Sequence, residues 1–347
     1  MQDKVMKVIF VVVFFAAMIT PLVNMLFSDG DKVLNLEKRT VVKPPKLEIQ
    51  NLEKFPRQFE KYFSDSFGFR NFLIDLNNRV SIKWFKTSTT PKVIVGKQGW
   101  LFYRSERSSD GNTIADYQGL APFSARQLHR IKLNIEEKAA WFSKRKIHFL
   151  IVLIPNKETV YSEYLPDYIK RGKTTRLDQI EALVRRHPHL PVINLKSVLM
   201  KRKKTTRIYY KGGTHWNQYG AYWGCMEIIR RLSHWYPDIR IIPLQAYRPA
   251  INPRSSKDHW FGFKENRFVQ LTLKPGYKSK INDYTLFAFR DSFLRTSPHF
   301  FKDHFRTYKE FSTRAIEQNL KVVEIEKPDI VIWEMVERCS DILLYLK

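Results

Sequence analysis

The sequence predicts an α/β protein, in which a parallel sheet is flanked by helices and one membrane-spanning helix precedes it. Residues 149–154 form an unbroken apolar run of buried-strand length. From residue 124 onward, such runs alternate with stretches of helical periodicity, and strands separated by helices favour right-handed βαβ units. The third observation is an apolar segment at residues 8–27, which as a helix is long enough to cross a bilayer.

The elements follow from local signals. Ser124 can cap a helix that runs to about Lys144, and the strand at residues 149–154 stops at Pro155. Turn residues at 96–99 between two short apolar runs predict a hairpin over residues 93–103. An amphipathic pattern predicts one or two helices, packed on a core, at residues 54–86. Further strands are expected at residues 192–195, 284–289 and 330–335, and further helices near residues 174–186, 216–235 and 312–320.

Composition restricts the class of protein. The chain has 347 residues, 44% of them hydrophobic, so it can bury a core and is not a disordered chain. Its 60 Lys and Arg against 34 Asp and Glu give a formal net charge of +26, which favours an anionic partner. The 2 cysteines exclude a disulfide scaffold and a Cys-only metal site. Cys225 and Cys339 either pair or are two small buried hydrophobes, and we favour the second reading.

Charges around the apolar N-terminal segment indicate its orientation. Lys4 and Lys7 precede it, and Asp29 and Asp31 follow it. The positive-inside rule then places the first residues in the cytoplasm and the body outside. A cleaved signal peptide is the alternative, and it also exports the body. Export argues against a nucleic acid as the anionic partner, which leaves a glycan or the membrane surface.

Three regions are expected along the chain. Residues 1–28 are a cytoplasmic stub and a transmembrane signal anchor, and residues 29–89 are a tether and N-terminal helices. Residues 90–347 form the α/β domain. Residues 245–283, richer in Pro, Lys and aromatics, are read as an insertion in that domain.

A serine follows one of the expected strands. Residues 286–289 run directly into Asp291 and Ser292, and open α/β sheets place reactive groups at the carboxyl ends of their strands. In this position the amide of Phe293 would face an oxyanion formed on an attacked carbonyl. Alternatively, Ser292 is only a helix N-cap. The neighbouring Asp291 is expected to shape the turn.

A histidine precedes a long expected helix. Gly212 and Gly213 bring His215 close to the start of that helix, which suits a general base. The alternative is a packed, hydrogen-bonded histidine beside Trp216.

Weaker site candidates lie elsewhere. Asn156 and Lys157 follow a buried strand, where they either line the cleft or an oxyanion site or form a plain strand-end turn. Trp100 and Tyr103 either stack on sugar rings or pack in the hairpin. Arg290 is a further candidate for substrate binding.

These features occur together with other motifs in a characteristic order. The motifs are Asp65-Ser66-Phe67-Gly68-Phe69-Arg70, Gly99-Trp100-Leu101-Phe102-Tyr103, Ile154-Pro155-Asn156-Lys157, Thr214-His215-Trp216-Asn217 and Arg290-Asp291-Ser292-Phe293. In this order the chain, from about residue 37 to its end, resembles the AlgX/AlgJ-type alginate O-acetyltransferase family.

The resemblance implies an SGNH-hydrolase-like, flavodoxin-like domain in the periplasm, anchored in the inner membrane, that acetylates an exopolysaccharide. Ser292 would be the nucleophile and His215 its base. A separate membrane-bound O-acyltransferase would supply the acetyl group, and no metal or organic cofactor is part of the pattern.

The chain departs from that family at one position. Two residues before His215, where the family has an aspartate, this chain has Gly213. A backbone carbonyl or water would then orient the imidazole, or a distant carboxylate such as Asp258, beside His259, would do so. The same departure motivates a second hypothesis, in which the protein is a catalytically impaired relative that binds polysaccharide or assembles a complex.

Overall fold

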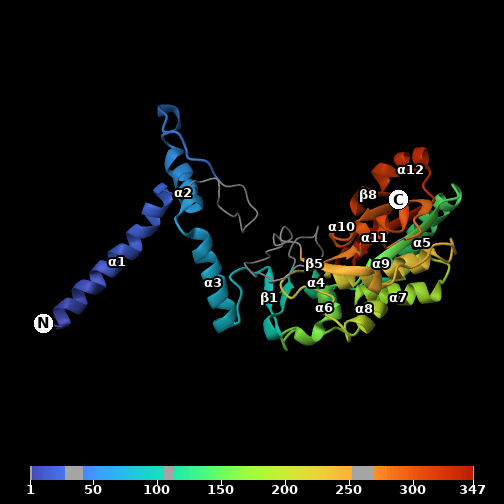
Figure 1. Cartoon of the computed structure of the whole chain (residues 1–347), viewed down its shortest axis with the longest axis horizontal. Coiled ribbons are helices and arrows are strands. Elements are labelled where there is room, and N and C mark those ends of the chain that lie inside the picture. Colours follow the sequence, from blue (N-terminus) through green and yellow to red (C-terminus); the bar gives the residue numbers. More distant parts are fainter. Residues whose placement is uncertain (1, 28–41, 105–111, 252–268, 278, 347) are drawn as a thin grey trace. The chain divides into compact units, whose positions relative to one another are not determined.

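The computed structural model describes residues 2–27, 42–104, 112–251, 269–277 and 279–346, and its contacts divide the chain into two units (Figure 1). Among the described residues, the first unit ends at Thr89 and the second contains the rest of the chain from Thr90.

The first unit contains three helices, α1 (Gln2–Phe27), α2 (Phe55–Ser66) and α3 (Arg70–Phe85). Within α1, the 22 residues Lys4–Met25 have a mean hydropathy of 2.4 and are long and apolar enough to span a membrane. This confirms the expected apolar N-terminal helix. The expectation that the helices at residues 54–86 pack on a core is wrong for α3, because Phe72 is 62% exposed and Trp84 is 76% exposed.

A five-stranded sheet forms the centre of the second unit, with the strand order β4-β3-β9-β7-β8. Every neighbouring pair in this sheet is parallel, which confirms the predicted parallel sheet. The strands are β3 (His148–Ile154), β4 (Val192–Asn194), β7 (Asn282–Arg290), β8 (Phe305–Ser312) and β9 (Ile330–Val336). Because β9 lies between β3 and β7, the carboxyl ends of these three strands are neighbours.

Alternate residues of the buried strands pack on opposite faces of the sheet. Val152 and Ala288 belong to one apolar cluster, and Ile151 and Phe287 belong to the other. The first face is covered by α8 (Lys196–Arg202), α9 (Gln218–Leu232), α10 (Ser292–Arg295) and α11 (Pro298–Lys302). The second is covered by α5 (Ala125–Ser143), α7 (Arg176–Arg186) and α12 (Leu320–Glu326).

Smaller elements complete the second unit. The expected hairpin forms, with β1 (Val93–Val95) antiparallel to β2 (Leu101–Tyr103). Two short helices follow hairpin and sheet strands, α4 (Thr113–Tyr117) and α6 (Lys157–Val160). In the expected insertion, β5 (Tyr247–Ile251) pairs antiparallel with β6 (Val269–Leu273).

Two local expectations were wrong. The helix expected near residues 312–320 is instead a pair of 3₁₀ turns, Thr313–Ala315 and Glu317–Asn319, and α12 begins only after them. The signals also missed β8, whose many exposed and charged side chains are typical of an edge strand. Cys225 and Cys339 are both free, so the disulfide alternative is wrong.

Candidate active site

Ser292 follows strand β7 and lies at the carboxyl end of the sheet. Asp291 is the N-cap of α10, where its Oδ1 accepts from the Phe293 amide at 2.7 Å and its Oδ2 accepts from the Val336 amide at 2.9 Å. The reading of Ser292 as the N-cap is therefore wrong, and the expectation that Asp291 shapes the turn is confirmed. Ser292 is the first helical residue, and its hydroxyl takes no part in capping.

The oxyanion assignment of Phe293 needs correction. Its amide N–H donates to the Asp291 carboxylate, so this N–H is occupied. Its ring, fully buried, lies 4.9 Å from the His215 ring between centroids. Phe293 thus supports the histidine by packing and does not offer a donor to a reacting carbonyl.

His215 lies at the end of a tight loop before α9. Tyr209 and Trp216 form an antiparallel bridge at the base of this loop, and the Tyr210 amide donates to the His215 carbonyl at 3.2 Å. The next turn is capped by Asn217, whose Oδ1 accepts from the amides of the second and third residues of α9. The loop backbone is thereby fixed on both sides of His215.

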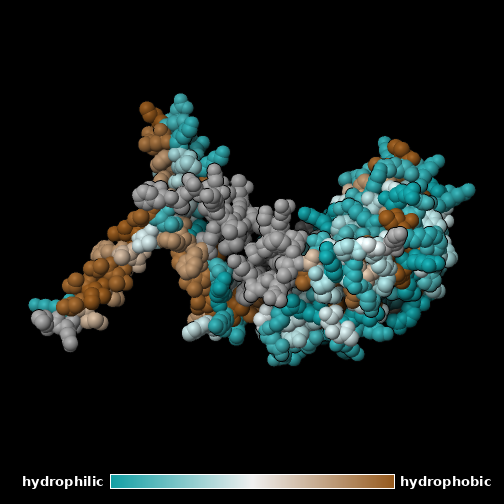
Figure 2. Space-filling model, viewed as in Figure 1, coloured by the Kyte–Doolittle hydropathy of each residue, from teal (hydrophilic) through white to brown (hydrophobic). Residues whose placement is uncertain are grey.

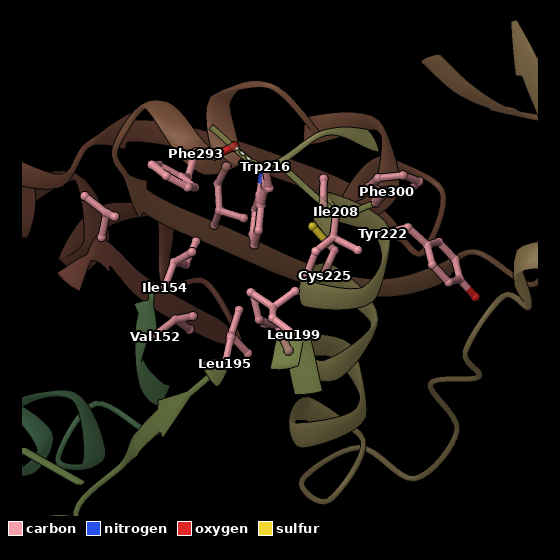
Figure 3. Close-up of a cluster of buried hydrophobic side chains, with 14 of the residues drawn as sticks. Val152, Ile154, Leu195, Leu199, Ile208, Trp216, Tyr222, Cys225, Phe293 and Phe300 are labelled. Atoms are coloured by element: carbon pink, nitrogen blue, oxygen red, sulfur yellow. Dashed lines mark hydrogen bonds between the residues drawn. The ribbon is translucent and has the colours of Figure 1, made fainter. Parts of the chain in front are cut away.

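Trp216 connects this loop to the serine turn (Figure 3). The indole is 1% exposed, and its Nε1 donates to the Phe293 carbonyl at 3.1 Å. Space for the indole comes from two glycines of α9. A Cβ on Gly224 would lie 2.5 Å from the indole, and a Cβ on Gly220 would lie 2.9 Å from the Trp216 Cβ. The residue after His215 is thus bonded to the residue after Ser292.

The structure brings the two predicted catalytic side chains together. His215 Nε2 lies 2.8 Å from Ser292 Oγ, within hydrogen-bond distance, and both residues are half-buried. On the other side of the ring, the Thr214 hydroxyl lies 3.4 Å from Nδ1, which is long for a hydrogen bond. Glycine at position 213 contributes no carboxylate there. The arrangement can move a proton between the hydroxyl and the imidazole.

Lys157 is buried rather than facing a cleft. Its exposed fraction is 2%, and its Nζ donates to the carbonyls of Leu101 and Lys211, each at 2.6 Å, and of Gly213 at 2.9 Å. One ammonium group therefore ties the β1–β2 hairpin to the loop of His215. We revise its role from substrate contact to support of the loop.

Asn156, also 2% exposed, precedes Lys157 and starts α6. Its amide donates to Glu337 Oε2 at 2.7 Å, and its side-chain oxygen lies 3.4 Å from a guanidinium nitrogen of Arg338. Arg338 also lies over the Phe293 ring, 5.7 Å from its centroid. Sequence reasoning missed Glu337 and Arg338. A signal existed, because a charged pair directly follows the buried strand β9, and Asn156 and Ser292 each lie two residues beyond the end of a neighbouring strand.

Three buried glutamates, Glu158, Glu334 and Glu337, lie near the segments that carry His215 and Ser292. Burial raises the pKa of Glu337 to about 8, and the nearby Asp116 carboxylate adds to the effect. Burial also raises the pKa of Glu158, and it raises that of Glu334 far more, with the Asp291 carboxylate contributing. Glu334 Oε2 accepts from the Asp291 amide at 2.8 Å. Each of these carboxyl groups accepts a hydrogen bond from a backbone amide, so they support the local backbone.

The remaining candidates are placed as follows. Trp100 is 2% exposed and stacks on Tyr164 at 4.7 Å between centroids, so the sugar-stacking role is wrong and the packing alternative holds. Tyr103 is half-buried, and its amide donates to Glu158 at 3.3 Å. Arg290 Nε donates to Glu310 at 2.9 Å, across β7 and β8. The candidate pair Asp258 and His259 lies outside the described residues.

A parallel sheet flanked by helices, with a serine after β7 in contact with a histidine before α9, defines the second unit as an SGNH-like α/β domain. Residues 93–258 match the family model described as the SGNH hydrolase-like domain of acetyltransferase AlgX. Residues 93–258 of the α/β domain are therefore similar to that family. The matched residues include His215 and end before Ser292.

Solved structures share this fold. Bacillus cereus PatB1, in a structure with a sulfonyl adduct, is similar with a TM-score of 0.53 and 12% identity, over 74% of this chain and 99% of that one. The O-acetyltransferase domain of Pseudomonas putida AlgJ gives a TM-score of 0.48 and 17% identity, over 73% of this chain and 93% of that one. Comparison with curated proteins gave no significant match.

Replacement of Lys157 tests its role in the loop. Lys157→Met leaves three buried carbonyls without their charged donor, and we expect a loss of about 2–4 kcal/mol in unfolding free energy. Chemical denaturation measures it. The matched control is Lys132→Met, which removes a half-buried ion pair with Glu136, one turn further along α5, and should cost less than about 1 kcal/mol. Equal losses in the two variants would contradict the assignment.

The raised pKa of Glu337 predicts a pH dependence of stability. Its pKa is about 8 in the folded protein against an ordinary 4.5, so the folded state holds a proton that the unfolded state releases. The stability it contributes is complete below the lower value and is lost as the pH rises toward the higher one. Glu337→Gln should therefore show a smaller fall in Tm than the parent between about pH 5 and pH 8. Parallel Tm profiles of parent and variant would refute this.

Proposed function

We propose that this protein is an O-acetyltransferase that works through an acetyl-serine intermediate. The observation that carries the proposal is the 2.8 Å contact between His215 Nε2 and Ser292 Oγ at the carboxyl end of the sheet. The similarity of residues 93–258 to the AlgX family model supports the choice of acetyl transfer among the reactions of such a pair.

The steps follow from the two side chains. His215 takes the proton of Ser292 as Oγ attacks the carbonyl carbon of the acetyl donor, and the protonated imidazole then gives that proton to the leaving group. Next, an acceptor hydroxyl gives its proton to His215 and attacks the acetyl-serine. Ser292 leaves as the alkoxide and recovers the proton from His215. Both half-reactions balance with the same base.

Developing negative charge on the carbonyl oxygen needs a donor. The Phe293 amide is occupied by Asp291. Among the described residues, the Ser292 amide has no acceptor, and it lies one residue closer to the reacting hydroxyl. We assign it as the backbone donor to the oxyanion.

The setting of the reaction is part of the proposal. We propose that α1 anchors the chain once in the inner membrane, with the α/β domain in the periplasm, because Lys4 and Lys7 precede the apolar run at residues 8–27 and Asp29 and Asp31 follow it. A net charge of +26 favours an anionic polysaccharide as acceptor. A membrane-bound O-acyltransferase is the proposed acetyl donor.

One observation favours a second function. Glycine at position 213 removes the carboxylate that would fix the imidazole tautomer, and this supports a catalytically impaired protein that binds polysaccharide or assembles a complex. Activity of the pure protein separates the two functions.

The full chain in detergent should hydrolyse a chromogenic acetyl ester, with an acetylated Ser292 peptide visible by mass spectrometry after brief incubation. Ser292→Ala and His215→Ala should lower the rate by about 10³-fold or more. Ser233→Ala, on the last turn of α9, is the control and should keep the parental rate. If parent and Ser292→Ala turn over equally, the enzymatic proposal is wrong and the second function is favoured.

Installing the missing carboxylate should increase activity. A Cβ on Gly213 meets only Tyr210 carbons, at 3.5 and 3.9 Å, which is ordinary van der Waals contact. Gly213→Asp should raise kcat by about tenfold or more, since a carboxylate stabilises the imidazolium. The control is Gly213→Ala, which adds the Cβ without the charge. Equal rates in the two variants would show that the imidazole does not use this carboxylate.

A further inference from the structure

Helix α3 has an apolar side that the described part of the chain leaves uncovered. Its members lie three and four residues apart, which places them along one side of the helix. They are Phe72, Leu73, Leu76, Val80 and Trp84, with exposed fractions of 62, 43, 45, 38 and 76%. Figure 2 shows hydrophobic surface along α1 and α3. A continuous apolar side of this kind marks a contact with a partner or a membrane.

The other sides of α3 carry polar and charged residues together with Ile74, Ile82 and Phe85. Arg79 pairs with Asp75 at 2.8 Å, and Lys83 lies in the last turn. Lys86 caps the helix. Lysine and arginine beside tryptophan, phenylalanine and leucine are the composition of helices that lie in a membrane interface, where the cations reach lipid phosphates.

Contacts with α1 place the start of α3 beside the end of the candidate span. The Phe69 amide donates to Asn24 Oδ1 at 3.3 Å, and Asn24 lies in the last turn of α1. Gly68 approaches the α1 backbone so closely that a Cβ there would lie 2.0 Å from the Pro21 carbonyl oxygen. If α1 crosses a bilayer, the first turn of α3 stands where α1 leaves the hydrocarbon. This position favours lipid over a soluble protein as the occupant.

We propose that α3 lies in the interface of the outer leaflet of the membrane that α1 spans, with Leu76 and its apolar neighbours toward the acyl chains. Lys83 and Lys86 contact lipid phosphates, and Trp84 sits at headgroup level. The proposal rests on the membrane anchoring given under the proposed function. It adds a second lipid contact on the periplasmic side.

Fluorescence quenching by lipids tests this contact in the full chain. Single cysteines at Leu76, Ser81 and Val12 carry the fluorophore NBD, in a background where Cys225 and Cys339 are alanine. Ser81 lies on another side of α3 and is the matched control. The proteins are placed in liposomes of phosphatidylethanolamine and phosphatidylglycerol that contain a nitroxide lipid, with the nitroxide either high on the acyl chain or near its end.

We expect the shallow nitroxide to quench the label at Leu76 about twofold or more over the label at Ser81, because only Leu76 faces the acyl chains. The label at Val12 should respond to the deep nitroxide. Quenching at Val12 with none at Leu76 would overturn the proposal and leave the anchor intact. Loss of quenching at Val12 itself would overturn the anchor as well. A Leu76 label that is shielded from aqueous iodide but is not quenched by lipid would also overturn the proposed lipid contact of α3, since a protein would then cover this helix.

Discussion

The hydrogen bond from the Trp216 indole to the Phe293 carbonyl is the contact on which the site depends. It joins the residue after the histidine to the residue after the serine, although these belong to segments that are distant in the chain. The indole is buried in the apolar cluster on one face of the sheet, so its position is set by core packing. The 2.8 Å contact between His215 and Ser292 is therefore a consequence of the core as much as of the two loops.

The turns that carry the pair are held by groups that do not react. Asp291 caps the serine turn and reaches the Val336 amide at the end of β9. Lys157 donates to three carbonyls, and one of them belongs to Gly213, two residues before His215. The two turns are thus fixed by one aspartate and one buried lysine, each hydrogen-bonded to backbone partners. On the other side of the imidazole, the Thr214 hydroxyl is 3.4 Å from Nδ1.

Much of this could be predicted from the sequence, because it depends on local pattern. The buried strands, the hairpin and the positions of Ser292 and His215 follow from apolar runs and from the residues that interrupt them. The predictions that were wrong concerned features that depend on tertiary contacts. Nothing in the sequence near Trp100 or Lys157 indicates burial beneath other segments, and the direction of the Phe293 amide is set by a carboxylate that also reaches across to β9. Glu334 left a readable signal, as a single charge inside an apolar strand.

The two glycines of α9 link helix stability to the geometry of the site. Each glycine weakens a helix by about 1 kcal/mol relative to alanine, so α9 depends on tertiary packing for its order. The indole of Trp216 packs against Gly224, and the Trp216 Cβ and the Ile208 carbonyl pack against Gly220. Fraying of α9 and withdrawal of the indole are then one cooperative opening event, and the base separates from the nucleophile whenever it occurs. The free energy of that local opening sets the fraction of molecules that are competent to react.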